Sequence, residues 1–290
     1  MFFTRDSTTP SSPLSAAVQA ADPGALRHPA FPGDYGLQAA HNLSIFRSQV
    51  LSRTVHQFTS PKLFDQAKKL ARFNTFPLTV TCPPGREVKL LGTGEGVKYA
   101  CDISELEKPC LIYSFGSEGD YAFENHVLSI TKCEVHTFDC TYKGEDQGPR
   151  HHYHEWCLGS EPDASMKGKG KFMTYKDIVV ELGHVGMEVE VLKIDIEGYE
   201  FQTMSGLHEF TPSLPKQVLI EVHFGRDDGN GNVYPTAVSA KNLSQMSLLF
   251  AHLANLGYAI FYRCDNFVDN IGCCSEFSLL RVEEGHTHVS

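Results

Sequence analysis

The 290-residue sequence predicts an α/β fold in which helices cover both faces of a mainly parallel sheet. From Pro109 onward, short apolar segments typical of strands alternate with segments whose apolar residues recur at helical spacing. The stretch Val218 to Ile220 is apolar without interruption, as expected of a central strand that is buried on both faces. Hydrophobic residues make up 41% of the chain and charged residues 21%, which excludes collagen-like, coiled-coil and fully disordered proteins.

The first third of the chain is predicted to extend this fold. Residues 1–33 are rich in Ser, Thr, Pro and Ala and lack sustained periodicity, so we expect a disordered tail there. Residues 34–104 are expected to form an N-terminal extension of helices and a β-hairpin. Apolar residues at helical spacing fit two helices within residues 36–73, and Ser60-Pro61 supplies the start of the second. Two apolar runs around a glycine-rich turn fit a hairpin at residues 87–101.

Residues 105–290 are predicted to form the main domain. Its seven strand candidates are Cys110–Phe115, Glu134–Asp139, His152–Leu158, Val189–Asp195, Gln217–Phe224, Ala259–Cys264 and Glu276–Val282. Helical patterns occupy Phe123–Ile130, Tyr175–Leu182, Phe201–Leu207 and Leu243–Leu256. Ligands of such sheets bind beyond the carboxyl ends of the strands, where the strand order reverses. The residues that follow each strand are therefore the candidate site residues.

Charge and hydropathy restrict the partners. The net charge is −10, so the chain lacks the positive field that binding to a nucleic-acid backbone requires, and nucleic acid is not an expected partner. No apolar run approaches the about 18 residues needed to cross a bilayer, and the first residues do not form a charged leader followed by an apolar block. We therefore expect no membrane segment in this chain and a soluble, cytoplasmic protein.

The cysteines leave a second compartment open. The nine cysteines show neither the paired spacing of a zinc ribbon nor the density of a small disulfide scaffold, so free thiols are predicted. Cys82 and Cys101 flank the predicted hairpin and could form a disulfide, whereas Cys273 and Cys274 fit a buried strand pair. The glycosylation sequons at Asn42 and Asn242 leave the lumen of the secretory pathway as the alternative location.

A glycine-containing loop follows the first strand of the main domain. Gly116 lets the main chain approach a ligand, and Asp139 ends the second strand 23 residues later, where an acidic residue would accept the hydroxyls of a ribose. The glycines of residues 92–96 form a competing loop. Counting the same distance from Gly96 ends near Ser117, which is not an acid at a strand end, so residues 92–96 are assigned to the hairpin turn. The spacing itself fits either a nicotinamide dinucleotide or S-adenosylmethionine.

The fourth strand carries a family resemblance. Leu192–Glu200 reads LKIDIEGYE, and with FMTYKDIVVELG before it and FQTMSGL after it, the segment resembles the signature of FkbM-type S-adenosylmethionine-dependent methyltransferases. The upstream IYSFGSEGDYAFE and EVHTFDCT resemble the first two strands of the methyltransferase-like proteins of eukaryotes. The resemblance runs from about Cys82 to Val282. It implies a class I methyltransferase fold, which is Rossmann-like, with a seven-stranded sheet whose last strand is antiparallel.

The resemblance also implies a cofactor and its contacts. S-adenosylmethionine would lie with its methionine part near Gly116 and Ser117 and its ribose at Asp139, and Asp195 would lie at the mouth of the site. The weaker cofactor candidates implied in the same way are Ser114, Gly119, Glu124 and Leu158. Leu158 and its neighbours would form the adenine pocket, although no acidic residue of the kind many methyltransferases use follows the third strand.

The implied reaction is methyl transfer to an oxygen of a small hydroxylated or sugar acceptor. The acceptor must lose a proton, either to a general base or because a divalent metal lowers its pKa. Asp195, Glu221 and His223 lie at the ends of the fourth and fifth strands and are the catalytic candidates. The same three residues could hold Mg²⁺ or Mn²⁺. Glu197 and Glu200 fit this site or the N-terminal cap of the next helix equally well, and His223 fits a structural role almost as well.

Two other function classes remain as alternatives. A nicotinamide-dependent oxidoreductase would need a pyrophosphate-binding loop and a hydride-transfer pair, and the sequence contains no convincing version of either. A noncatalytic interaction module of the same fold would tolerate substitution of Asp139 and Asp195. Lys193 interrupts an apolar strand and is assigned no catalytic role. A zinc site is not expected at the histidines of residues 151–154, because no second group with ligand spacing accompanies them. The oligomeric state is left open.

Overall fold

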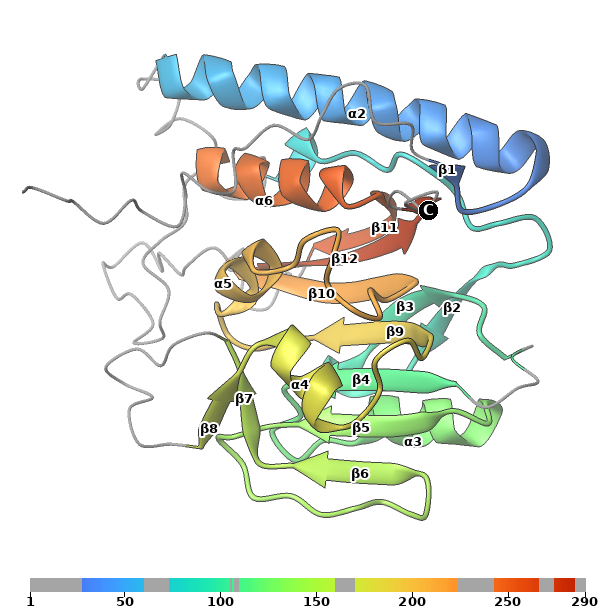
Figure 1. The fold of residues 1–290 in the computed structure, drawn as a ribbon, viewed down its shortest axis with the longest axis vertical. Helices are drawn as coiled ribbons and strands as arrows, with labels where there is room; N and C mark the ends of the chain where they lie inside the picture. The colour runs from blue at the N-terminus through green and yellow to red at the C-terminus, as the bar shows by residue number, and fades with distance from the viewer. Residues whose placement is uncertain are drawn as a thin grey trace, which may run out of the picture.

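A seven-stranded sheet in the order β11-β12-β10-β9-β4-β5-β6 forms the centre of the molecule (Figure 1). The computed structural model describes residues 28–59, 73–104, 106, 110–159, 170–223, 243–265 and 274–284. The strands are β4 (Leu111–Phe115), β5 (Glu134–Phe138), β6 (His151–His154), β9 (Val189–Ile194), β10 (Gln217–His223), β11 (Tyr258–Asp265) and β12 (Cys274–Arg281). All neighbours pair in parallel except at β12, which is antiparallel to both β10 and β11. The predicted class I sheet, with its last strand antiparallel, is confirmed.

Helices cover both faces of this sheet, as predicted. Every residue of β4 and β9 is buried, because α4 (Tyr175–Glu181) lies in front of the sheet and α3 (Ala122–Ile130) behind it (Figure 1). The remaining helices of the main domain are α5 (Glu200–Ser205) and α6 (Leu243–Asn255).

The third predicted strand, His152–Leu158, is the one that the structure corrects. Only β6 joins the main sheet. The chain then leaves the sheet at Glu155, and β7 (Trp156–Leu158) pairs with β8 (Lys171–Met173) in a separate two-stranded sheet. A disulfide between Cys140 and Cys157 holds β7 beside the loop that follows β5. This cross-link directs the chain away from the sheet edge toward the carboxyl end of β5.

The N-terminal extension is anchored on the main domain. The helix α2 (Gly33–Thr59) packs along α6, and its Arg47 donates hydrogen bonds to the carbonyl of Ala254 and to the carboxylate of Glu283. The short strand β1 (His28–Pro29) pairs with β13 (Glu283–Glu284). Residues 1–27 of the predicted tail and the predicted second helix of the extension lie outside the described residues.

The predicted hairpin is confirmed as β2 (Val88–Leu91) and β3 (Lys98–Cys101), with a short 3-10 turn η3 (Gly94–Gly96) between them. It lies against the sheet. The amide of Gln217 in β10 donates to the Cys101 carbonyl at 3.0 Å and accepts from the Cys101 N–H at 2.8 Å. The hydroxyl of Ser278 in β12 donates to the carbonyl of Tyr99. The hairpin is therefore part of the core, and its inward side chains reach strands of the main domain.

The prediction of free thiols is wrong. Three disulfides are present within the described residues, joining Cys82 to Cys101, Cys110 to Cys133 and Cys140 to Cys157, and Cys274 is also disulfide-bonded. The bridge between Cys82 and Cys101 is the one that the sequence suggested. The second bridge forms because its two cysteines immediately precede β4 and β5, which lie side by side, so that their Cα atoms are 4.3 Å apart. Cys264 is the free cysteine among the described residues.

Removing the hairpin disulfide by the paired substitution Cys82→Ala and Cys101→Ala is expected to lower the free energy of unfolding by about 3 kcal/mol, since the bridge closes a loop of sequence separation 19. Urea denaturation of the two proteins measures the difference. Cys264→Ser is the matched control, because this thiol is free and exposed, and it is expected to change stability by less than about 0.5 kcal/mol. An unchanged midpoint in the paired variant would show that the bridge does not constrain the unfolded chain.

No helix of the described part of the chain has both the length and the apolar character that crossing a membrane requires. The sequon residue Asn42 lies in α2, where its amide donates to the carbonyl of Thr79 at 3.0 Å. The other sequon residue, Asn242, is outside the described residues.

Candidate active site

The loop that follows β4 and the acid that follows β5 form one hydrogen-bonded unit. The Oδ2 atom of Asp139 accepts the N–H groups of Ser117 at 2.9 Å and Glu118 at 2.8 Å. Its Oδ1 atom accepts the N–H groups of Thr141 at 2.8 Å and Tyr142 at 3.2 Å. The structure therefore brings together the two segments that the spacing of 23 residues related, at the carboxyl edge of the sheet.

Asp139 carries two further contacts, both from hydroxyl groups. Thr141 Oγ1 donates to Oδ1 at 2.7 Å, and Ser117 Oγ lies 3.4 Å from Oδ2. Burial alone would raise the pKa of Asp139, but the hydrogen bonds from Thr141, Glu118 and Ser117 outweigh it and lower the pKa below its ordinary value. The carboxylate is thus an anion with every acceptor position in use. A ligand hydroxyl can bind it only by replacing one of these donors, and the two side-chain hydroxyls can rotate away without moving the main chain.

Gly116 lies where the strand order reverses between β4 and β9. Its φ is +79°, and a Cβ atom there would lie 1.7 Å from the carbonyl oxygen of Asp195. Glycine is therefore required by the close approach of two strand ends as well as by any ligand. The Nζ atom of Lys193 donates to the Gly116 carbonyl, so Lys193 holds this loop in place.

The buried acid Glu124, in the first turn of α3, lies behind the same loop. Its Oε1 atom accepts the hydroxyl of Ser114 at 2.5 Å, and its Oε2 atom is buried without a hydrogen-bond partner. A buried carboxylate oxygen without a donor is costly. Glu124 therefore offers an acceptor for a donor that the protein itself does not supply. Gly119, also in this loop, has a φ of +82° and lies against the ring of Tyr142.

Leu158, the predicted adenine contact, lies in β7. It is buried, and its carbonyl accepts the hydroxyl of Thr203 from α5 at 3.4 Å. The disulfide at the preceding residue, Cys157, links it to the segment that follows Asp139. The disulfide therefore keeps Leu158 close to the segment that follows the carboxyl end of β5.

A second group of side chains occupies the ends of β9 and β10, and it includes a lysine that the sequence analysis missed. Lys98 of β3 is fully buried and contacts Asp195 at 3.2 Å and Glu276 at 2.5 Å. Glu276, at the start of β12, was missed as well. Burial raises the pKa of Asp195, but Lys98, Lys193 and His223 outweigh it and lower the pKa to about 2. Asp195 is therefore an anion that is held by a buried cation.

His223 lies among three carboxylates. Its Nδ1 atom is 3.0 Å from Glu200 Oε1, and its Nε2 atom is 3.6 Å from Glu197 and 3.9 Å from Glu221. Burial lowers the pKa of His223, but the charge and hydrogen bond of Glu200 outweigh it and raise the pKa to about 10. A protonated imidazole does not accept a proton. The geometry therefore favours an electrostatic role for His223 over the predicted role as a general base.

Glu200, the first residue of α5, holds the turn that precedes the helix. Its Oε1 atom accepts the N–H groups of Ile196 and Gly198, both at 3.1 Å, whereas the N-cap residue Tyr199 makes no side-chain capping hydrogen bond. Its Oε2 atom is buried without a hydrogen-bond partner. Glu197 is mostly exposed at its side chain and lies beside His223.

Within the described residues, the predicted trio of Asp195, Glu221 and His223 does not form a group whose ligand atoms all lie within 4.8 Å of one another. Asp195 instead forms such groups with Glu221 and Glu276 and with Glu197 and His223. However, the Nζ atom of Lys98 already lies between Asp195 and Glu276. A buried ammonium group neutralises the charge that a divalent ion would otherwise neutralise, and a second cation beside it would be repelled. These residues therefore fit a metal-free site better than an Mg²⁺ or Mn²⁺ site.

Glu221 has a carboxyl group whose pKa is raised into the neutral range. Burial and the neighbouring Asp195 raise the pKa of Glu221 to about 8. Because this pKa lies above the value of about 4.5 in the unfolded chain, the stabilising contribution of Glu221 is complete below pH 4.5 and is lost as the pH rises through 8.

Between pH 5 and 6.5 Glu221 stays protonated in the folded protein and loses its proton in the unfolded chain, so its own contribution to the free energy of unfolding falls by about 2 kcal/mol. Burial lowers the pKa of His136 to about 3 and of His154 to about 4, so both histidines contribute a rise over the same range. The test is therefore the difference between the wild type and Glu221→Gln in urea denaturation, which is expected to fall by about 2 kcal/mol from pH 5 to 6.5. An equal slope in the variant would show that Glu221 does not control the pH dependence.

A cavity of about 520 Å³ opens at the end of β11. Its lining residues are Asn74, Phe76, Pro77, Leu78, Arg263 and Asp265. Arg263 donates to both carboxylate oxygens of Asp265 and to the amide oxygen of Asn74, so the lining combines charged groups with an aromatic ring. Cys264 of β11 lies opposite Glu276 of β12, and Glu276 contacts Lys98. The strand that lines the cavity is therefore paired with the strand that carries a partner of Lys98.

Comparison with known proteins identifies a protein family that matches most of the chain. A family model described as a methyltransferase domain matches residues 44–281. No curated protein sequence matches the chain. Among solved structures, TrmK of M. capricolum in complex with S-adenosyl-homocysteine is similar with a TM-score of 0.32 and 12% identity, over 64% of this chain and 68% of that chain. The fibrillarin pre-rRNA processing protein of Methanococcus jannaschii is similar with a TM-score of 0.33 and 14% identity, over 72% of this chain and 89% of that chain.

Proposed function

The chain belongs to the methyltransferase-domain family, and from this premise we propose that it transfers a methyl group from S-adenosylmethionine to an oxygen of a small hydroxylated or sugar acceptor. The observation that carries the cofactor assignment is the junction of the Gly116 loop with Asp139, at the point where the strand order reverses. The FkbM-like motif at Leu192–Glu200 supports the same class of reaction.

In this proposal Asp139 binds the ribose. The hydroxyls of Thr141 and Ser117, one on each carboxylate oxygen, stand in for the two ribose hydroxyls and rotate away when the cofactor binds. The Oε2 atom of Glu124, which is buried without a hydrogen-bond partner, could accept a hydrogen bond from the cofactor, for example from the ammonium group of its methionine part. The cofactor supplies a methyl group on a sulfonium, which is already a good leaving group. The protein therefore contributes mainly positioning.

Glu221 is the proposed general base. A base works best when its pKa is close to the working pH. Glu221, with a pKa of about 8, is mostly protonated at pH 7, but the fraction that has lost its proton is much larger than that of His223, whose pKa is about 10, and Asp195, whose pKa is about 2, is too weak a base. The acceptor hydroxyl would give its proton to Glu221 as its oxygen attacks the methyl carbon. Lys98 and the protonated His223 would hold Asp195 and Glu221 in position and limit the repulsion between the two carboxylates.

Two properties support the class of acceptor and the compartment. The net charge of −10 favours a small acceptor over nucleic acid, and the polar cavity beside Arg263 and Asp265 is the proposed entry for it. The three disulfides support an oxidising compartment, so we favour the lumen of the secretory pathway over the cytoplasm.

Calorimetry with S-adenosylhomocysteine and with NAD tests the cofactor. S-adenosylhomocysteine is expected to bind with a 1:1 stoichiometry and NAD is not. Binding of NAD alone would replace this proposal with the nicotinamide-dependent oxidoreductase. Binding of neither would favour a noncatalytic module of the same fold. Lys98 already neutralises Asp195 and Glu276. Addition of Mg²⁺ or Mn²⁺ is therefore expected to leave the affinity for S-adenosylhomocysteine and the rate of methyl transfer unchanged.

A further inference from the structure

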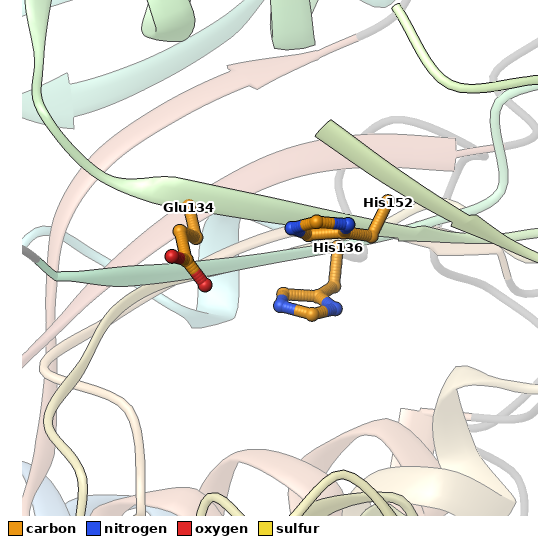
Figure 2. A group of neighbouring side chains, drawn as sticks. All are labelled: Glu134, His136 and His152. Atoms are coloured by element: carbon orange, nitrogen blue, oxygen red, sulfur yellow. The ribbon is translucent and has the colours of Figure 1, made fainter. Parts of the chain in front are cut away.

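A cluster of histidines lies away from the strand ends, on the face of the sheet that α4 covers. The strand register places Tyr113 of β4, His136 of β5 and His152 of β6 in one row, each opposite the next. Glu134 lies two residues before His136, so it projects from the same face of β5. Figure 2 shows Glu134, His136 and His152 beside one another. The row belongs to the middle of the strands, whereas Asp139 and the cofactor loop lie beyond their carboxyl ends.

His136 has a hydrogen-bonding position that the protein leaves empty. The residue is 6% exposed, and its Nδ1 atom lies 3.0 Å from His154 Nε2. Its Nε2 atom is buried without a hydrogen-bond partner. A buried ring nitrogen without a partner is costly, so a ligand at this atom would remove a cost that the folded protein otherwise carries.

Two further ligand groups lie beside His136. One ligand atom each of Glu134, His136 and His152 lies within 4.8 Å of the other two. Glu134 is exposed and His152 is half-buried, so the group borders the solvent on the side of these two residues. Strands β5 and β6 are held in register beneath the group by parallel pairing, and the disulfide at Cys133 fixes the start of β5 next to Glu134.

We propose that Glu134, His136 and His152 form a binding site for a divalent transition-metal ion, with Zn²⁺ as the preferred ion. Two imidazole nitrogens and one carboxylate oxygen are a common ligand set for Zn²⁺, whereas Mg²⁺ and Ca²⁺ prefer oxygen ligands alone. Three protein ligands leave a fourth position for water or for a group from another molecule.

The second contact of His136 supports this assignment. When Nε2 binds a metal, the proton of the neutral ring lies on Nδ1, which then donates to His154 Nε2. Such a hydrogen bond to the other nitrogen of a ligating histidine fixes its tautomer and the orientation of its ring. His184, whose ring lies 4.8 Å from that of His136, adds a further imidazole beside the site.

The histidines of residues 151–154 do not form this site by themselves. His151 projects to the opposite face, where its Nε2 atom contacts Thr137 Oγ1 and its Nδ1 atom accepts the N–H of Gln147. The other two ligands, Glu134 and His136, come from β5, because the pairing of β5 with β6 places His136 opposite His152. The sequence analysis did not find these two ligands. The site is independent of the proposed methyl transfer.

Titration of the untagged, full-length protein with ZnCl₂ by calorimetry tests the site. The expected result is one tightly bound Zn²⁺ per chain. Glu134→Gln and His152→Gln should each weaken this binding at least about 10-fold. His41→Gln is the matched control, because His41 is an exposed histidine of α2, and it should leave the affinity unchanged. CoCl₂ in place of ZnCl₂ should give visible absorption bands that disappear in the same variants.

Two results would overturn the proposal. One is Zn²⁺ binding that is absent or is unchanged by both Glu134→Gln and His152→Gln. The other is binding that is lost in Glu197→Gln but kept in Glu134→Gln, which would place the ion at the strand-end acids instead. Because Glu134 is exposed, its variant is expected to fold normally, and the thermal melting curve of each variant checks this.

Discussion

Replacing Asp139 with alanine is expected to weaken the binding of S-adenosylhomocysteine at least about 100-fold, because two hydrogen bonds from ribose hydroxyls to a carboxylate contribute about 1.5 kcal/mol each. The same variant removes the acceptor for the N–H groups of Ser117, Glu118 and Thr141. We therefore also expect a lower free energy of unfolding. Calorimetry at a temperature where both proteins are folded separates the two effects.

Two companion variants make this test specific. Asp139→Asn keeps the shape of the side chain and loses the charge, so it should weaken binding with a smaller loss of stability. Thr141→Val removes a hydroxyl that competes for Oδ1, so it should leave S-adenosylhomocysteine affinity unchanged or raise it. Normal affinity in Asp139→Ala would mean that the ribose is held elsewhere. Weaker binding in Thr141→Val would mean that its hydroxyl contacts the ligand instead of giving way to it.

The parts of the molecule that local patterns specify were predictable. Alternating strands and helices gave the seven-stranded sheet, and an acid at a strand end 23 residues after Gly116 gave the Asp139 junction. Both depend on residues that are close in the sequence. The split of the third strand was not predictable in this way, because it follows the covalent link between Cys140 and Cys157.

Some missed features did leave a signal. Cys110 and Cys133 each precede a strand, and the two strands were expected to be neighbours, so their disulfide could have been inferred. Glu276 is the third residue of β12, the last strand of the seven-stranded sheet. Because that strand runs antiparallel to the others, its first residues lie at the edge where the parallel strands end. The same argument from neighbouring strands would have related His136 to His152.

The charge state of His223 could not be read from the sequence. Its raised pKa depends first on Glu200, which is fully buried and accepts N–H groups of the turn before α5. The sequence showed an imidazole beside carboxylates, which fits a base and a cation equally well. The number and distance of the acids around the ring decide between them, and these follow from tertiary packing.

Lys98→Met is expected to lower the free energy of unfolding by about 3–5 kcal/mol, because it leaves the buried acids Asp195 and Glu276 without their counter-charge. Burial lowers the pKa of Lys98, but Asp195, Glu276 and Glu221 outweigh it and raise the pKa above its ordinary value, so the lysine is charged in the folded protein. Urea denaturation at pH 7 measures the loss. Lys89→Met is the matched control on the same hairpin, since Lys89 is exposed and its contact with Glu87 is a surface ion pair, so this variant is expected to change stability little.

The double variant Lys98→Met and Glu276→Gln separates the lost ion pair from lost packing. Neutralising Glu276 removes one of the two uncompensated charges, so part of the stability should return. No recovery, or a loss below about 1 kcal/mol in the single variant, would show that the acids adjust by taking up protons instead. Because Lys98 reaches Asp195 over 97 residues of sequence, a recovery would also show that the hairpin is an integral part of the candidate active site rather than a separable cover.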